Sequence, residues 1–107
     1  MDLLTRLEEV ILMAIWRLKS NAYGVTINKE VSERVKKNYS MGALYFTLDQ
    51  LHNKGYISKS IGNPTPERGG RRKIFYELTP EGKKSLLAAR ELQNSLWDGI
   101  SRVAFER

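Results

Sequence analysis

The chain has 107 residues, 41% of them hydrophobic, with a formal net charge of +6, and this size fits one compact domain. It contains no cysteine, which excludes disulfides and thiolate metal sites and makes an intracellular location the simpler expectation. The longest unbroken apolar run, residues 10–16, is far shorter than the ~18 residues needed to cross a bilayer. We therefore expect a cytoplasmic protein without a membrane span or a signal peptide.

The positive charge is concentrated in one segment. Residues 54–76 contain six lysines and arginines and one glutamate, and therefore hold five of the six excess charges. Residues 1–34 and 77–107 are each neutral, with five acidic and five basic side chains. Such a concentration creates a local positive potential that suits phosphate or another polyanion.

Hydrophobic periodicity predicts three helices in the first half of the chain. Apolar residues at three- and four-residue steps indicate an amphipathic helix from about residue 3 to residue 19. A second, shorter helix is marked by apolar residues at every fourth position, Ile27, Val31 and Val35. Ser40 is a suitable N-cap for a third helix, and Gly55 stands where a left-handed residue would end it. The third helix would bury one stripe of leucines, Leu44, Leu48 and Leu51.

The pattern then changes to the two-residue period of strands. Apolar residues alternate with polar ones in residues 57–61 and again in residues 73–78, which predicts two half-buried strands. The connection between them is rich in glycine and proline and longer than a simple reversal of the chain requires. A connection of this length favours a functional role.

The last predicted helix begins at Thr79, because a hydroxyl cap followed by Pro80 and Glu81 is a strong helix-start signal. We expect it to continue to about Ala104, which at 1.5 Å per residue gives roughly 40 Å, longer than so small a domain can cover. Its apolar seam would then need a second chain to cover it. The expected dimer interface combines apolar residues of the first and last helices, namely Leu4, Leu7, Ile11, Ala89, Leu92, Leu96, Ile100 and Val103.

This order of elements predicts an α+β, mostly α fold. It is a winged helix-turn-helix of three helices and a two-stranded β-wing, followed by a long C-terminal dimerisation helix. We assign residues 1–78 to the winged-helix DNA-binding domain and residues 79–107 to the dimerisation helix. In such folds the second helix supports the third, which enters a major groove of DNA.

Several short motifs occur together in this order. They are Tyr23 and Gly24, then Gly42, Ala43, Leu44 and Tyr45, then Leu48, Leu51, Lys54, Gly55, Tyr56 and Ile57, then residues 68–73, Tyr76 and Leu78, and finally Thr79, Pro80, Glu81 and Gly82. With them, residues 5–92 resemble the PadR-like family of winged-helix transcriptional regulators, especially its short subgroup with a single C-terminal dimerisation helix. Two positions depart from the family pattern, Phe46 in place of proline and His52 in place of glutamate. We expect Phe46 to change the packing beside the DNA-facing surface.

The resemblance implies a homodimer, a palindromic operator and commonly repression. On the predicted fold, the residues expected to contact DNA lie on the third helix, near it and in the wing. They are Tyr23, Ser40, Gly42, Ala43, Tyr45, Thr47, Lys54, Arg68, Gly69, Gly70, Arg71, Arg72 and Lys73. Arginines bind phosphate oxygens bidentately, and glycines let the backbone approach closely. The plainer interpretations are a solvated basic turn for the wing and an aromatic wedged between helices for Tyr45.

Trp97 has two interpretations. Some regulators that resemble this chain bind flat aromatic effectors between their last helices, which makes Trp97 a candidate effector-binding residue. The other interpretation is an aromatic in the core of the dimer interface, because large rings supply much of the contact area there. Trp16 is assigned to the core or to the same interface.

The sequence shows no set of residues for catalysis, a metal or a cofactor. His52 is the only histidine, and no nucleophile motif accompanies it and Asp49. We therefore predict a DNA-binding transcriptional regulator, expected to be a repressor, that binds a palindromic operator as a homodimer. Whether a small aromatic effector releases it from DNA is left open by the sequence. The alternative is a protein-interaction adaptor that uses the same winged-helix scaffold to bind an acidic partner.

Overall fold

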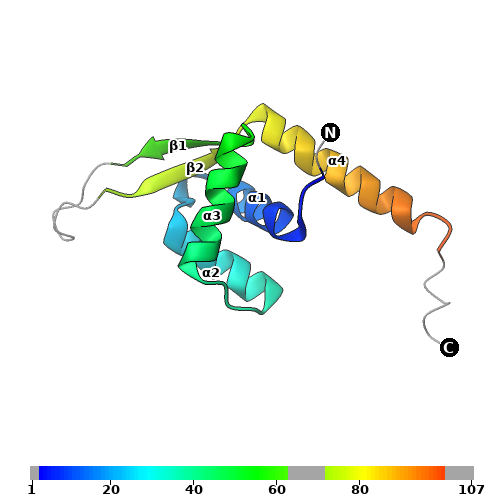
Figure 1. The fold of residues 1–107 in the computed structure, drawn as a ribbon, viewed down its shortest axis with the longest axis horizontal. Coiled ribbons are helices and arrows are strands. Elements are labelled where there is room, and N and C mark those ends of the chain that lie inside the picture. Colours follow the sequence, from blue (N-terminus) through cyan, green and yellow to red (C-terminus); the bar gives the residue numbers. More distant parts are fainter. Residues whose placement is uncertain (1–2, 63–71, 101–107) are drawn as a thin grey trace.

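The computed structural model describes residues 3–62 and 72–100 of the chain. Four α-helices, one short 3-10 helix and two strands follow one another in the predicted order (Figure 1). Their bounds are α1 (Arg6–Leu18), η1 (Lys19–Asn21), α2 (Gly24–Val35), α3 (Met41–Asn53), β1 (Ile57–Ile61), β2 (Ile74–Leu78) and α4 (Pro80–Trp97). The described residues therefore form the mostly helical α+β fold that the sequence predicts.

A single hydrophobic core joins all of these helices to the base of the wing. The leucine stripe of α3 is buried, and helix α1 supplies more buried side chains than any other described element. The core residues are Ile11, Leu12, Ala14, Ile15, Ala22, Ile27, Val31, Leu44, Leu48, Leu51, Ile57, Tyr76, Leu78 and Leu86. Because Leu86 belongs to α4, the first turns of that helix are fixed against the winged-helix core.

Local hydrogen bonds set where the helices begin. The Thr5 hydroxyl accepts the Glu8 N–H at 3.1 Å, and the Glu8 carboxylate accepts the Thr5 N–H at 2.8 Å. This reciprocal cap starts α1 at Arg6, later than the predicted residue 3. The predicted caps Ser40 and Thr79 are confirmed, since each hydroxyl accepts a backbone N–H of the first turn that follows.

The wing is an antiparallel pair in which Ile57 lies opposite Leu78 and Ile61 lies opposite Ile74. Only its base is half-buried as predicted, because Ile61 and Ile74 remain 66% and 42% exposed. On its other edge, β2 joins the start of α2, where the Tyr76 N–H donates to the Ala22 carbonyl at 2.8 Å. The wing is therefore anchored at its base and extends beyond the helices.

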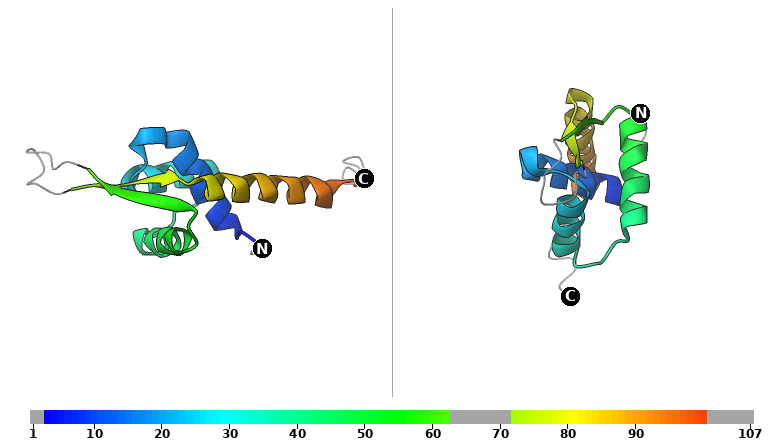
Figure 2. Two further views of the ribbon diagram at one scale, coloured as in Figure 1. Left: turned by 90° about the horizontal axis from the view of Figure 1, so that it is seen from above. Right: turned by 90° about the vertical axis from the view of Figure 1, so that its left-hand side faces the viewer.

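Helix α4 ends at Trp97, so the prediction that it continues to about Ala104 is wrong for residues 98–100. Asp98 leaves the helical conformation and Gly99 has a positive φ of 82°, a left-handed conformation typical of glycine after a helix. Residues 101–104 lie outside the described part of the chain. The helix extends away from the other elements, on the side opposite the wing (Figures 1 and 2). Within the described residues, none of the helices has the length and apolarity to cross a membrane.

Candidate nucleic-acid interface

Helix α3 forms the outer layer on one side of the molecule, with one long face open to solvent (Figure 2). Its inner side buries Leu44, Leu48 and Leu51. The residues that alternate with this stripe are exposed, among them Gly42, Phe46 and Gln50. The helix can therefore present a complete face to an external surface while its other face holds it to the core.

The start of α3 is open enough for close approach. Ser40 caps it by accepting the Ala43 N–H at 3.1 Å. A Cβ placed on Gly42 would meet only the Ser40 hydroxyl, at 4.0 Å, so no neighbouring side chain shields this turn. Helix N-termini carry partial positive charge from unpaired N–H groups and favour anions such as phosphate.

Tyr45 is wedged between α2 and α3 and also reaches the surface. Its hydroxyl occupies the space that a Cβ on Gly24 would need, so the ring packs directly on the start of α2. The residue is nevertheless 41% exposed. Glycine at position 24 thus allows α2 and α3 to approach closely while Tyr45 still reaches the surface.

The outer end of β2 places a cation beside the start of α2. The ammonium of Lys73 lies 4.3 Å from the centroid of the Tyr23 ring, a cation–π contact. The same ring meets Phe75 edge-on, with centroids 5.5 Å apart and an interplanar angle of 70°. Tyr23 therefore connects the wing to α2 and holds Lys73 in place, while Arg72 is exposed beside it.

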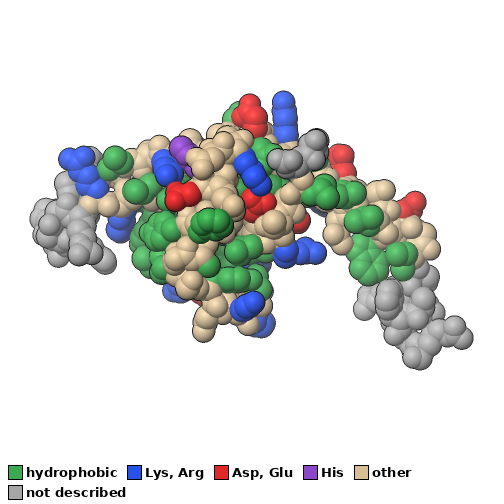
Figure 3. Space-filling view, viewed as in Figure 1, with side chains coloured by type: hydrophobic (Ala, Val, Ile, Leu, Met, Phe, Trp, Pro, Cys, Tyr) green, Lys and Arg blue, Asp and Glu red, His purple; other side chains and the backbone are tan. Residues whose placement is uncertain are grey.

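Four predicted contacts, Arg68, Gly69, Gly70 and Arg71, lie outside the described residues. The described part of the wing end carries other Lys and Arg side chains at the surface (Figure 3). The positive charge there belongs to the same segment that the sequence singled out.

Thr47 does not reach the surface, which corrects its assignment to DNA contact. It is only 6% exposed, and its hydroxyl donates to the Ala43 carbonyl at 3.0 Å. It lies on the side of α3 that faces the core, beside the leucine stripe. A side chain in this position supports α3 and cannot touch a bound molecule.

Lys54 is engaged in an ion pair inside the protein. Its ammonium donates to the carboxylate of Glu8 at 2.8 Å, and Glu8 is 2% exposed. Burial raises the pKa of Glu8, but hydrogen bonds from Lys54 and the Thr5 backbone outweigh it, so the pKa is held below its ordinary value of 4.5. Lys54 therefore joins the end of α3 to the start of α1, and its expected contact with DNA stays a prediction.

Two exposed residues of α3, Phe46 and Gln50, were missing from the sequence-based set. Phe46 was expected to change local packing, yet its side chain points outward and is 64% exposed. The sequence itself indicates this exposure. Phe46 stands two residues from both Leu44 and Leu48, and helical geometry places such a residue on the opposite side of the helix.

Asp49 and His52, in the second half of α3, have different surroundings. Asp49 lies beside the wing, where the Lys59 ammonium approaches its carboxylate at 3.4 Å. His52 is exposed near the end of α3. Across residues 3–62 and 72–100, no three His, Asp or Glu side chains are grouped closely enough to hold a metal ion.

A second surface, here called the α1–α4 face, consists of exposed apolar side chains on those two helices. Helix α4 contributes Leu87, Leu92, Leu96 and Trp97, and α1 contributes Met13 and Trp16, each at least 40% exposed. Trp16 therefore does not belong to the core. Ile11, predicted at the interface, is 0% exposed and packs inside its own core, so that assignment is wrong.

The other residues predicted at the dimer interface differ in their exposure. Leu4, Leu7 and Ala89 are partly buried within the chain, and Ile100 is 50% exposed beyond the end of α4. Val103 lies outside the described residues.

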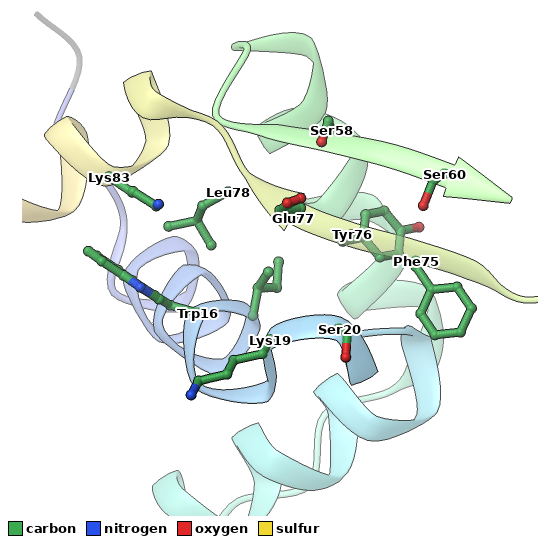
Figure 4. Close-up of a pocket in the computed structure, with 11 residues that line it drawn as sticks. Trp16, Lys19, Ser20, Ser58, Ser60, Phe75, Tyr76, Glu77, Leu78 and Lys83 are labelled. Atoms are coloured by element: carbon green, nitrogen blue, oxygen red, sulfur yellow. The ribbon is translucent and has the colours of Figure 1, made fainter. Parts of the chain in front are cut away.

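A cavity of about 500 Å³ separates α1 and the start of α4 from the wing (Figure 4). Trp16 and Lys83 line one end and Phe75 the other, and the Lys83 ammonium lies 5.5 Å from the Trp16 ring centroid. Its charged lining residues are Lys19, Glu77 and Lys83. The lining therefore has mixed charge, and its residues come from the wing and from both helices of the α1–α4 face.

Comparison with known proteins bears on this arrangement. Residues 11–88 match the transcriptional regulator PadR-like family. The structure of RosR from H. salinarum is 30% identical with a TM-score of 0.69, over 92% of this chain and 81% of that one. A PadR family transcription regulator from Clostridium difficile is 28% identical with a TM-score of 0.67, over 95% and 97% of the two chains. No curated protein sequence matches the chain.

Proposed function

This chain belongs to the PadR-like family of transcriptional regulators, and from that membership we propose that it regulates transcription by binding double-stranded DNA directly. The main supporting observation is that α3 buries one side in the core and leaves its outer side exposed. In winged-helix proteins the third helix enters the major groove, and the wing contacts the flanking backbone. The Lys73 ammonium beside the start of α2 is suitably placed for such a backbone contact.

Each group of residues has a distinct part in the proposal. Ser40 and Gly42, with the adjoining Ala43, would meet the DNA at the start of α3, and Tyr45 would donate its hydroxyl to a phosphate. At the wing, Lys73 and the exposed Arg72 would neutralise flanking phosphates. The wing residues outside the described range, Arg68, Gly69, Gly70 and Arg71, would extend that contact.

We further propose that the active species is a homodimer that binds a palindromic operator and represses transcription. The α1–α4 face supports this, because six large apolar side chains on it are each at least 40% exposed. Two-fold symmetry would place both α3 helices in successive major grooves about 34–36 Å apart. The division at residues 78 and 79 into a DNA-binding part and a dimerisation helix belongs to the same proposal.

Regulation by a small aromatic effector is proposed at Trp97. This residue ends α4 within the α1–α4 face and is 51% exposed, so its ring is accessible for stacking. An effector would release DNA only if it bound the DNA-free dimer more tightly than the DNA-bound one.

Selection of oligonucleotides from a random pool tests DNA binding and operator symmetry together. We expect enrichment of one palindromic sequence, whose affinity falls roughly a thousandfold between about 50 and 200 mM salt if the dimer neutralises about six to ten phosphates. No enrichment, or a flat salt dependence, would contradict the proposal and favour the adaptor.

A charge-removing pair of variants locates the contact. Lys73→Ala should weaken binding to all sequences and reduce the salt dependence by about one phosphate contact per protomer, or two per dimer. Lys84→Ala removes the same charge from exposed α4 and should change neither quantity. Equal losses in both variants would mean that binding reflects net charge alone.

A further inference from the structure

The outer face of α3 has an unusual composition for a helix that binds DNA. Between Met41 and Asn53 it has no lysine or arginine, and its one carboxylate, Asp49, is approached by Lys59 of the wing. Arginine or lysine on guanine is the commonest specific base contact in the major groove. Helix α3 therefore must read bases by another chemistry.

Phe46 lies near the middle of this face and is largely open to solvent. It is 64% exposed, more than any of the other described aromatic side chains. Gly42 precedes it by one helical turn and has no side chain, so the ring is accessible from the start of the helix. Full exposure of a phenyl ring to water is unfavourable, and contact with an apolar surface would relieve it.

Gln50 follows Phe46 by one helical turn and is also exposed. Residues four apart on a helix have neighbouring side chains, about 5–6 Å apart at Cβ. Base pairs are stacked about 3.4 Å apart, so these two side chains would reach the same base pair or adjacent ones. The face thus offers one apolar ring and one amide to a short stretch of major groove.

The major groove has one apolar group, the C5-methyl of thymine, and glutamine pairs bidentately with N6 and N7 of adenine. We propose that Phe46 and Gln50 make α3 a reader of A·T pairs, with Phe46 packed on a thymine methyl and Gln50 bonded to adenine. This inference rests on the proposed function. It adds which bases the helix selects and which side chains select them.

Single thymine-to-uracil replacements in the selected operator test the methyl contact, because uracil pairs normally but lacks that methyl. At one thymine of each half-site we expect the affinity to fall about fourfold. This factor corresponds to the hydrophobic free energy of burying one methylene group. Phe46→Ala should bind the thymine operator more weakly and no longer distinguish uracil from thymine there. Val25→Ala, which trims another exposed apolar side chain, should retain the full discrimination.

The amide contact is tested in the same way with 7-deazaadenine, which lacks the N7 acceptor. The unaltered protein should lose about tenfold in affinity at one adenine, and Gln50→Ala should lose nothing further from that replacement. Both variants change exposed side chains, and thermal melting verifies that they fold.

The outcomes separate the two proposals. Absence of DNA binding by the unaltered protein overturns the proposed function and this inference together. Tight operator binding that is indifferent to every uracil replacement, or a Phe46→Ala variant that still discriminates, overturns the inference alone. The latter results would assign the exposed ring to contact with a protein instead.

Discussion

At the scale of single residues, the ion pair of Glu8 and Lys54 is one cause of a pH-dependent stability. Removing Lys54 leaves a carboxylate that is 2% exposed without its cation, and losing one partner of a buried pair typically costs about 3–5 kcal/mol. Lys54 is itself 32% exposed, so we expect Lys54→Met to lower the free energy of unfolding by about 3 kcal/mol at pH 7. Urea unfolding followed by circular dichroism measures this difference.

The pH dependence of that difference has a definite sign. The pKa of Glu8 is lower in the folded protein than its ordinary value of 4.5, so its contribution is complete well above that pH. The contribution is lost as the pH falls below 4.5 and through the folded pKa. The gap between the unaltered protein and Lys54→Met should therefore shrink in acid. Lys59→Met, which removes an exposed pair with Asp49, should cost under about 1 kcal/mol.

At the scale of elements, the contact between α2 and α3 depends on glycine at position 24. A Cβ there would overlap the Tyr45 hydroxyl, and overpacking of this kind costs about 1–3 kcal/mol. We expect Gly24→Ala to destabilise the protein by that amount in urea unfolding. The double variant with Tyr45→Ala should recover part of the loss, because the obstructing ring is gone.

Gly42→Ala is the matched control for that prediction. Its added methyl enters open space at the start of α3, so we expect no loss and a small gain from reduced freedom of the unfolded chain. If both glycine variants were equally destabilised, the loss could not be assigned to the contact with Tyr45.

The elements also show which features a sequence determines by itself. Helix starts at Ser40 and Thr79 were predicted because a cap is made by residues adjacent in the chain. The end of α4 was placed too late, although Gly99 after Asp98 was a local stop signal. The apolar seam that continues past Trp97 predicts a longer helix, and that prediction is wrong for residues 98–100.

The sequence-based assignments of residues to buried or exposed faces are wrong where contacts between helices decide which side is covered. Periodicity identified the apolar side of α1, but it could not show that Ile11 on that side is enclosed by its own chain, while Met13 and Trp16 stay exposed. Likewise Thr47 is near the expected DNA-contacting residues in sequence, yet it turns to the core. The exposed position of Phe46 follows from helical spacing alone once the leucine stripe is identified.

At the scale of the whole molecule, the proposed pairing of two copies depends on the α1–α4 face. A stable interface buries about 800 Å² on each partner around an apolar centre. Leu92 and Leu96 lie one turn apart on α4 and are 41% and 63% exposed, which places them at the centre of such a contact. We expect Leu92→Glu to abolish the dimer, because an unpaired carboxylate would be buried at the interface.

Sedimentation velocity checks this expectation, with Asn38→Glu as the control. Asn38 is exposed in the connection between α2 and α3 and is not part of the α1–α4 face, so the same added charge there should leave the dimer intact. The monomeric Leu92→Glu variant should also bind the palindromic operator far more weakly, since two linked half-site contacts become one. An unaltered protein that sediments as a monomer, or equal behaviour of the two variants, would show that α4 is not the site of pairing.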